Sequence, residues 1–312
     1  MFKMFPKQWT PVLPVAEVKD TPVAVELAGE SLVIFRNLEG KFGALLNRCP
    51  HRGVPLSMGR VTENGCLECP YHGWNFTTNG ACIRVPLNDL KPAQLSKLSV
   101  VNFPTKIIAG LIWVFTGTGN PPELEVPESL LQPENRYFVH HEVWNTHWTR
   151  CVENALDYLH IPFVHQNSFG RELNDTARTN AIAQINIREI TDGMRINSKI
   201  NTLAHGIEID WHKPNNVVVK FDLVGVGIPV RGHIFSIPIN AQQTRFMQVI
   251  LANPGIDKTK FDFNQFVAPS FEDRVIVESQ VGEVPNTTEE CNVGTDEASL
   301  RFRRWYHSVV VD

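Results

Sequence analysis

Two short segments in the first quarter of the chain each place one cysteine close to one histidine. They are Cys49-Pro-His51 and Cys69-Pro-Tyr-His72. Thiolate and imidazole are the side chains that most often bind soft and borderline transition metals. Together the two segments offer four such donors, which is a full set for a metal centre. We therefore expect these four residues to bind metal rather than to form disulfides.

Zinc and iron are the two metals that fit this donor set. Zinc binds two Cys and two His tetrahedrally, but its usual spacing pairs Cys with Cys and His with His. Each segment here mixes the two types, which favours a Rieske [2Fe–2S] cluster, in which two Cys hold one iron and two His hold the other. Gly53 and Gly73 follow the histidines closely. Glycine allows the backbone to approach the cluster and donate N–H bonds to it.

A second group of residues that could contribute to a metal site lies at Asp157, His160 and His165, with the two histidines as candidate ligands. On a regular helix Asp157 and His160 would share a face, whereas two histidines five residues apart would not. We expect Pro162 to break or distort the helix and bring the histidines together. With a carboxylate from elsewhere, they would form the 2-His-1-carboxylate triad of Fe(II) oxygenases. Spacing alone leaves open that both histidines are ordinary core residues.

The elements around the first segments are short strands. Val23–Leu27, Leu32–Phe35 and Phe42–Leu46 alternate or run apolar between turns that contain glycine. This pattern predicts a small antiparallel β domain. The apolar run Ile107–Phe115 is nine residues long and predicts one buried strand.

A stretch rich in proline and glycine, Gly117–Pro133, predicts a boundary between two domains. We expect one domain at residues 1–120 and a second at residues 121–312.

The second domain combines helices with alternating strands. Arg150–His160 and Phe271–Gln280 predict helices, and Ile182–Asn253 predicts a series of strands. The fold class is therefore α+β, with a long antiparallel sheet and helices on one face.

Composition excludes several classes of function. The chain of 312 residues has a net charge of −4 and no long Lys/Arg run, which argues against nucleic acid as a partner. The longest apolar run is less than half of the ~20 residues needed to span a bilayer, so we expect no membrane segment and a cytoplasmic protein. A Gly-x-Gly-x-x-Gly fingerprint for NAD(P)H or flavin is absent from the sequence.

The two Cys/His segments resemble a known family. CPHRGVPLSMG (49–59) and CPYHGWNF (69–76) are similar to the Rieske domain of ring-hydroxylating and demethylating oxygenases. Respiratory-chain Rieske proteins carry an extra cysteine in each loop, where this chain has Val54 and Tyr71. The resemblance implies a β-rich Rieske domain followed by a helix-grip-like catalytic domain. Thr295–Trp305 resembles the short C-terminal helix of this branch of the family.

The same resemblance implies a set of metal ligands. The spacing Asp157-x-x-His160-x-x-x-x-His165 resembles the mononuclear iron motif of the family, and FEDRVIVESQ (271–280) resembles the helix that supplies the carboxylate. We expect Asp273 as that ligand, with Glu272 and Glu278 as alternatives. The implied cofactors are a [2Fe–2S] cluster and one Fe(II), and the implied ligands are Cys49, His51, Cys69, His72, His160, His165 and Asp273.

Two more residues gain a role from the family alone. Asp157 matches the carboxylate that accepts a hydrogen bond from a cluster histidine of the neighbouring subunit, here His72. Asn154 matches a position beside the iron that does not bind it firmly.

The implied function is the terminal oxygenase component of a Rieske monooxygenase. It would use O2 to hydroxylate, or to demethylate oxidatively at O or N, a small organic substrate. Electrons would come from a separate NAD(P)H-dependent reductase, alone or with a ferredoxin, and the expected assembly is a homotrimer. One alternative is a cis-dihydroxylating ring dioxygenase, and another is an electron-transfer protein with an inactive second site.

The remaining cysteines and histidines carry weaker expectations. Cys66, Cys82, Cys151 and Cys291 are expected to be structural. His140, His141 and His147 are expected at the surface or in hydrogen bonds. One further group could line the substrate pocket: His205, His212 and His233.

Overall fold

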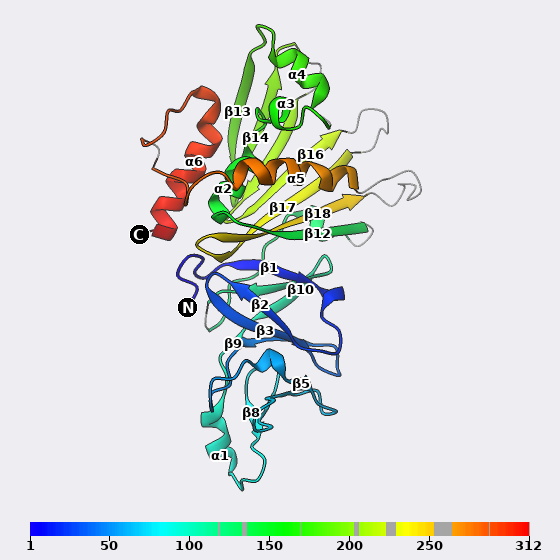
Figure 1. Cartoon of the computed structure of the whole chain (residues 1–312), viewed down its shortest axis with the longest axis vertical. Helices are drawn as coiled ribbons and strands as arrows, with labels where there is room; N and C mark the ends of the chain where they lie inside the picture. Colours follow the sequence, from blue (N-terminus) through cyan, green and yellow to red (C-terminus); the bar gives the residue numbers. More distant parts are fainter. Residues whose placement is uncertain are drawn as a thin grey trace. The chain divides into compact units, whose positions relative to one another are not determined.

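The protein is described here by a computed structural model that covers residues 1–117, 119–132, 136–168, 170–202, 206–222, 229–252, 264–286 and 288–311. The chain forms two compact units, Met1–Val126 and Pro127–Asp312 (Figure 1). The boundary expected after residue 120 lies in the same proline-rich segment as this division. His205 lies outside the described residues.

Three small antiparallel sheets build the first unit. The three-stranded sheet has the order β1-β11-β10, namely β1 (Trp9–Pro14), β11 (Leu111–Phe115) and β10 (Thr105–Ile108). One four-stranded sheet has the order β2-β3-β4-β9, namely β2 (Val23–Leu27), β3 (Glu30–Arg36), β4 (Phe42–Leu46) and β9 (Asn102–Phe103). The other has the order β5-β6-β7-β8, namely β5 (Arg60–Val61), β6 (Leu67–Glu68), β7 (Asn75–Phe76) and β8 (Cys82–Arg84). A short helix, α1 (Pro92–Leu95), follows β8.

The single strand expected at Ile107–Phe115 is wrong. Ala109 and Gly110 form a turn with positive φ angles of 54° and 70°, and they split the run into the hairpin β10–β11. Ile107 is 47% exposed, whereas all five residues of β11 are buried. Periodicity missed the turn because the residues on both sides of it are apolar.

The core of the first unit extends to the expected cluster cysteines. Cys49 and Cys69 are each 2% exposed and pack in one apolar cluster with residues such as Phe35, Leu45 and Phe76. The two cysteines are therefore held within the apolar core of this unit.

A seven-stranded antiparallel sheet dominates the second unit, with the order β12-β18-β17-β16-β15-β14-β13. The strands are β12 (Arg136–Trp144), β13 (Ala183–Ile190), β14 (Gly193–Ile200), β15 (Ile207–His212), β16 (Asn216–Asp222), β17 (Pro229–Asn240) and β18 (Gln243–Ala252). From β13 to β18, each strand pairs with the next strand in the sequence. β12 instead pairs with β18, so the first and last strands of the unit lie side by side at one edge of the sheet.

Helices cover one face of this sheet, and α2 and α5 lie across it in Figure 1. The helices of the unit are α2 (Trp148–Leu156), α3 (Ile161–Val164), α4 (Arg171–Ala177), α5 (Asn264–Val277) and α6 (Glu297–Tyr306). Trp144 stacks on Phe246 with ring centroids 4.1 Å apart, and both pack with Cys151 of α2 and Val277 of α5. Large buried aromatic rings of this kind contribute several kcal/mol to the attachment of such helices.

The helix expected at Arg150–His160 ends earlier than predicted. It stops at Leu156, and Asp157 has an extended backbone (φ −88°, ψ 128°). Asp157 Oδ1 accepts a hydrogen bond of 2.7 Å from the backbone N–H of Leu159, and this local bond replaces the helical one. The break therefore lies at Asp157, and Asp157 and His160 do not share a helical face.

Pro162 has a different role from the one expected. It lies in the first turn of the short helix α3. Backbone N–H groups in the first turn have no intrahelical acceptor, so proline, which lacks an N–H, costs no hydrogen bond there. It therefore helps to begin a helix between the two histidines rather than to interrupt one.

The expected helix at Phe271–Gln280 begins seven residues earlier than predicted, because α5 starts at Asn264 and includes Pro269. The short C-terminal helix is present as α6. Among the described residues, none of the helices has the length and apolar character needed to cross a bilayer.

Candidate metal centres

The first Cys/His loop is closed by two backbone hydrogen bonds. The N–H of Cys49 donates to the carbonyl of Val54 (2.9 Å), and the N–H of Gly53 donates to the carbonyl of Cys49 (2.9 Å). Gly53 has a φ of +74°, which a residue with a side chain rarely adopts. The geometry of this loop thus depends on glycine at this position.

The second loop repeats this construction. The N–H of Cys69 donates to the carbonyl of Trp74 (2.8 Å), and the N–H of Gly73 donates to the carbonyl of Cys69 (3.0 Å). Gly73 has a φ of +68°, and a Cβ atom there would lie 3.1 Å from Cγ of Pro86. The two loops are therefore equivalent supports, each with a buried cysteine at its base.

The two histidines of these loops meet each other. The rings of His51 and His72 have centroids 4.6 Å apart, and His51 also stacks on Trp74 at 4.7 Å with an interplanar angle of 6°. His72 is exposed, whereas Cys49 and Cys69 are buried. The sequence did not identify Trp74 as the residue that orients His51, although its place directly after Gly73 was a usable signal.

Burial shifts the pKa of two of these four donors, and the two shifts affect metal binding differently, because a raised thiol pKa means that a metal must displace the proton of Cys49. Burial, with a smaller contribution from the neighbouring Cys69, raises the pKa of Cys49 to about 11. Desolvation, with His72 and Arg52 nearby, lowers the pKa of His51 and favours the neutral imidazole that binds metals. His51 Nδ1 is buried without a hydrogen bond partner among the described residues. A buried nitrogen in that situation is costly unless it has a ligand such as a metal.

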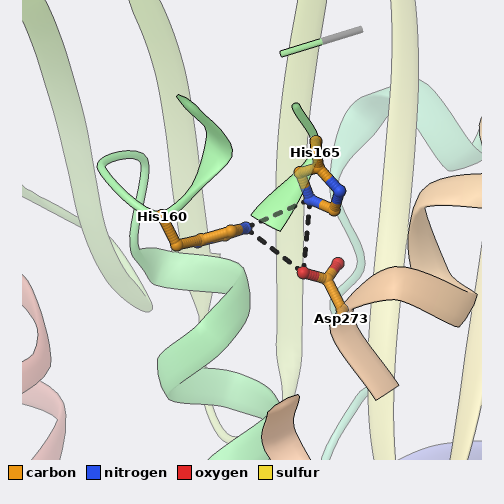
Figure 2. Close-up of side chains that lie close together, drawn as sticks. All are labelled: His160, His165 and Asp273. Carbon is orange, nitrogen blue, oxygen red and sulfur yellow. Dashed lines mark hydrogen bonds and ion pairs between the residues drawn. The ribbon is translucent and has the colours of Figure 1, made fainter. Parts of the chain in front are cut away.

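The second group of donors comes from two distant parts of the chain. His160 immediately precedes α3, His165 immediately follows it, and Asp273 lies on α5. Figure 2 shows the three side chains pointing toward one another, with α5 bringing the carboxylate from the opposite side. One full turn of helix between the histidines brings their rings together, with centroids 5.2 Å apart.

The three donor atoms form an almost equilateral triangle. His160 Nε2 lies 3.3 Å from His165 Nε2 and 3.3 Å from Asp273 Oδ1, and His165 Nε2 lies 3.2 Å from the same oxygen. An octahedral ion with bonds of about 2.1 Å places adjacent ligand atoms about 3.0 Å apart. The separations therefore match three ligands on one face of such an ion. Among the described residues this is the only cluster of its kind.

Burial and charge shape this triangle. Burial by itself lowers the pKa of His160, but Asp157 and Asp273 outweigh it and raise that pKa to about 9. Burial by itself raises the pKa of Asp273, but hydrogen bonds with His160 and His165 lower it to about 2. In the metal-free protein the pair is thus an imidazolium and a carboxylate, and a metal ion must displace the proton on binding.

Each histidine also faces a second carboxylate. His165 Nδ1 lies 2.7 Å from Glu272 Oε2, which accepts a further bond of 2.8 Å from Ser168 Oγ. His160 Nδ1 lies 3.5 Å from Asp157 Oδ2, whose side chain is 45% exposed. Glu272 is thus placed on the outer nitrogen of His165 and not in the triangle. Ser168 had no signal in the sequence.

The other site candidates fall into two groups. Asn154 Nδ2 donates to Asp273 Oδ1 at 3.3 Å, so it lies beside the triangle. Glu278 instead accepts bonds from the backbone of Asn145 and from Arg274, away from the triangle.

The remaining cysteines and histidines lie outside both donor sets. Cys66, Cys82 and Cys151 are buried, and Cys291 is exposed. His212 pairs with Asp192, and His233 is fully buried beside Ser129. His147 is buried at the N-terminus of α2, where its Nδ1 lies 2.8 Å from Thr149 Oγ1.

Two protein families match the sequence. The family described as the Rieske [2Fe-2S] domain matches residues 8–101. The family described as the vanillate O-demethylase oxygenase C-terminal domain matches residues 144–312. The two matches contain every residue of the two donor sets.

Curated relatives of the chain agree with these families. The chain is 39% identical over 160 residues to the 3-chlorobenzoate-3,4-dioxygenase oxygenase subunit of Comamonas testosteroni, which is 50% of this chain and 37% of that protein. It is 36% identical over 170 residues to chlorophyllide a oxygenase of Chlamydomonas reinhardtii, 54% of this chain and 25% of that protein. The matched regions thus span well under half of these relatives.

The fold has a close counterpart among solved structures. NdmA of Pseudomonas putida CBB5, solved with caffeine, superposes with a TM-score of 0.82 at 22% identity, covering 97% of this chain and 90% of that one. The β-rich first unit and the helix-covered antiparallel sheet confirm the expected fold class. With both family matches, this chain belongs to the Rieske oxygenases, a family whose members carry a [2Fe–2S] cluster and a mononuclear iron.

Proposed function

We propose that the chain is the terminal oxygenase component of a Rieske non-haem iron monooxygenase. In this proposal Cys49, His51, Cys69 and His72 hold the [2Fe–2S] cluster, and Fe(II) is held by His160, His165 and Asp273. The observation that carries the proposal is the triangle of two imidazole nitrogens and one carboxylate oxygen, with sides of 3.2 to 3.3 Å.

When bound, a ferrous ion on this triad would supply O2 activation, because three protein ligands leave coordination positions open for O2 and substrate. The surrounding side chains have roles of their own. His165 and Asp273 are 3% and 14% exposed, so their donor atoms are largely shielded from water. Asn154 donates to Asp273 Oδ1 and restrains the carboxylate that faces both histidines.

Electron supply in this proposal involves a second copy of the chain. The exposed His72 and the 45% exposed carboxylate of Asp157 are both accessible from outside their own units. We infer that Asp157 accepts a hydrogen bond from His72 of another copy in a homotrimer. The electrons originate from a separate NAD(P)H-dependent reductase, alone or with a ferredoxin.

The substrate in this proposal is a small organic molecule that is hydroxylated or demethylated at O or N. Hydroxylation of a methyl group on oxygen or nitrogen gives a product that loses formaldehyde, so both outcomes share one oxygen insertion. The family match to the vanillate O-demethylase domain supports this reaction. cis-Dihydroxylation of a ring is the second candidate, and the 39% identical dioxygenase subunit favours it.

The substitution His160→Ala tests the proposed second site. We expect the variant to retain the cluster, because the Cys/His loops belong to the other unit. It should lose the additional iron and all product formation, since two donors bind a divalent ion far more weakly than three. Iron content, cluster absorption and product formation with a surrogate reductase measure these properties. Product formation at the wild-type rate would rule out His160 as a ligand.

The iron content of the unsubstituted protein distinguishes the proposed oxygenase from an electron-transfer protein with an inactive second site. Such a carrier would hold about two irons per chain rather than about three.

A further inference from the structure

We propose that Glu272 positions His165 for metal binding without being a ligand itself. The inference rests on the proposed mononuclear iron site and concerns the nitrogen of His165 that faces away from it. Glu272 precedes the proposed ligand Asp273 in α5, and the two carboxylates contact opposite sides of one imidazole ring.

The distances define the two contacts. Asp273 Oδ1 lies 3.2 Å from His165 Nε2, and Glu272 Oε2 lies 2.7 Å from His165 Nδ1. Consecutive residues of a helix point in directions about 100° apart. One turn of α5 can therefore reach both nitrogens of the ring.

The contact at Nδ1 determines the tautomer of His165. A neutral imidazole has one N–H donor and one nitrogen with a free lone pair. Glu272 accepts the hydrogen of Nδ1, so the lone pair lies on Nε2, inside the donor triangle. Carboxylates with this role are common beside metal-bound histidines, and they fix both the ring orientation and its basicity.

Glu272 is itself held in place by the segment that follows α3. Ser168 Oγ donates to Glu272 Oε2 at 2.8 Å, and the N–H of Ser168 donates to the carbonyl of His165 at 3.0 Å. The imidazole and the hydroxyl that hold this carboxylate thus come from one short stretch of backbone. The arrangement joins α5 to the end of α3 directly behind the proposed metal ligand.

His160 lacks an equivalent support. Its Nδ1 is 3.5 Å from Asp157 Oδ2 and has no hydrogen bond partner among the described residues. The side chain of His165 is 3% exposed and that of His160 is 17% exposed. His165 is therefore the fixed histidine of the pair, and its orientation should contribute most to metal affinity.

The test is a titration of the mononuclear site with Co(II) in protein that retains its cluster. The ligand-field absorption of Co(II) reports binding during the titration. The substitutions are Glu272→Ala, Glu272→Gln and Ser168→Ala. The matched control is Glu278→Gln, a carboxylate on the same helix region that contacts Asn145 and Arg274 instead of the triangle. Cluster absorption and circular dichroism report folding in every variant.

We expect Glu272→Ala to bind Co(II) about 10- to 100-fold more weakly, with a changed ligand-field spectrum. Glu272→Gln still offers an oxygen to Nδ1 and should recover part of that affinity. Ser168→Ala should lose less than Glu272→Ala, and Glu278→Gln should match the wild type.

The inference is overturned if Glu272→Ala binds Co(II) as tightly as the wild type with an unchanged spectrum. It is also overturned if Glu278→Gln loses as much affinity as Glu272→Ala. If the wild type binds neither Co(II) nor Fe(II) outside its cluster, the proposed function itself fails. That result differs from equal Co(II) binding by the wild type and Glu272→Ala, which overturns only the role of Glu272.

Discussion

At the scale of single residues, the triad is surrounded by negative charge. Three carboxylates, those of Asp157, Glu272 and Asp273, face the four nitrogens of His160 and His165. Only Asp273 faces both rings through their Nε2 atoms. A divalent cation in the triangle would offset two of these three negative charges.

Asp157 gives the most specific prediction at this scale. In Asp157→Asn the remaining oxygen can still accept the Leu159 N–H bond, so the local turn should persist. The NH2 group that replaces the other carboxylate oxygen donates hydrogen bonds and cannot accept one from an imidazole N–H. We expect both metals to remain bound and turnover to fall about 10- to 100-fold, the usual effect of losing a residue that supports a ligand.

Iron content, the cluster spectrum and product formation check this prediction. A variant with full iron content and wild-type turnover would show that Asp157 has no part in electron transfer.

Residue types and spacing indicated the four Cys/His donors and the pair His160 and His165, whereas Asp273 was expected only from the resemblance to the family. Asp273 and Glu272 are adjacent carboxylates, and the sequence does not show which one points toward His160. The difference arises from the packing of α5, which begins 99 residues after His165 in the sequence. Local spacing contains no information about such a long-range contact.

At the scale of elements, the segment 148–165 shows where periodicity fails. Apolar residues at helical spacing continue through Leu159, but Asp157 forms a competing bond with the backbone of Leu159 and ends α2. The end of the helix exposes Asp157 and allows His160 to turn toward His165. Periodicity indicates that a helix is present much better than it indicates where the helix ends.

The N-terminus of α2 gives a prediction on pH. Burial lowers the pKa of His147 to about 4, with Glu283 opposing and Arg150 adding to the shift. Its usual value is about 6.5, so the unfolded chain binds one more proton than the folded chain between pH 4 and 6.5. The contribution of His147 is therefore fully present above pH 6.5 and is lost as pH falls toward 4, by about 3 kcal/mol in total.

His147→Asn should reduce this pH dependence. Asparagine is a good N-cap and does not titrate, so helix α2 should keep its cap. We expect the slope of unfolding free energy against pH, between 4 and 6.5, to decrease by up to about 1.4 kcal/mol per pH unit. Urea unfolding of the variant and the parent, followed by tryptophan fluorescence in the same buffers, measures it. Parallel slopes would show that His147 is not buried in its neutral form.

At the scale of the whole molecule, each unit has its own core and its own donor set. In the first unit, Cys49 and Cys69 are part of the apolar core. The proposed [2Fe–2S] site and the fold of this unit therefore depend on the same packing. In the second unit, the triad depends on helices that pack on the seven-stranded sheet through Trp144 and Phe246. Alternation and turns predicted β2, β3 and β4 and a series of strands at Ile182–Asn253, but they missed the turn at Ala109 and Gly110 that divides β10 from β11.

The central claim is that one chain carries a Rieske cluster and a separate mononuclear iron. The most direct test is electron paramagnetic resonance of anaerobically purified, dithionite-reduced protein, with iron and sulfide quantified on the same sample. We predict a rhombic signal with an average g below the free-electron value, about three irons and about two sulfides per chain. A Rieske signal with only about two irons would contradict the mononuclear site, and bound zinc without any signal would contradict both sites.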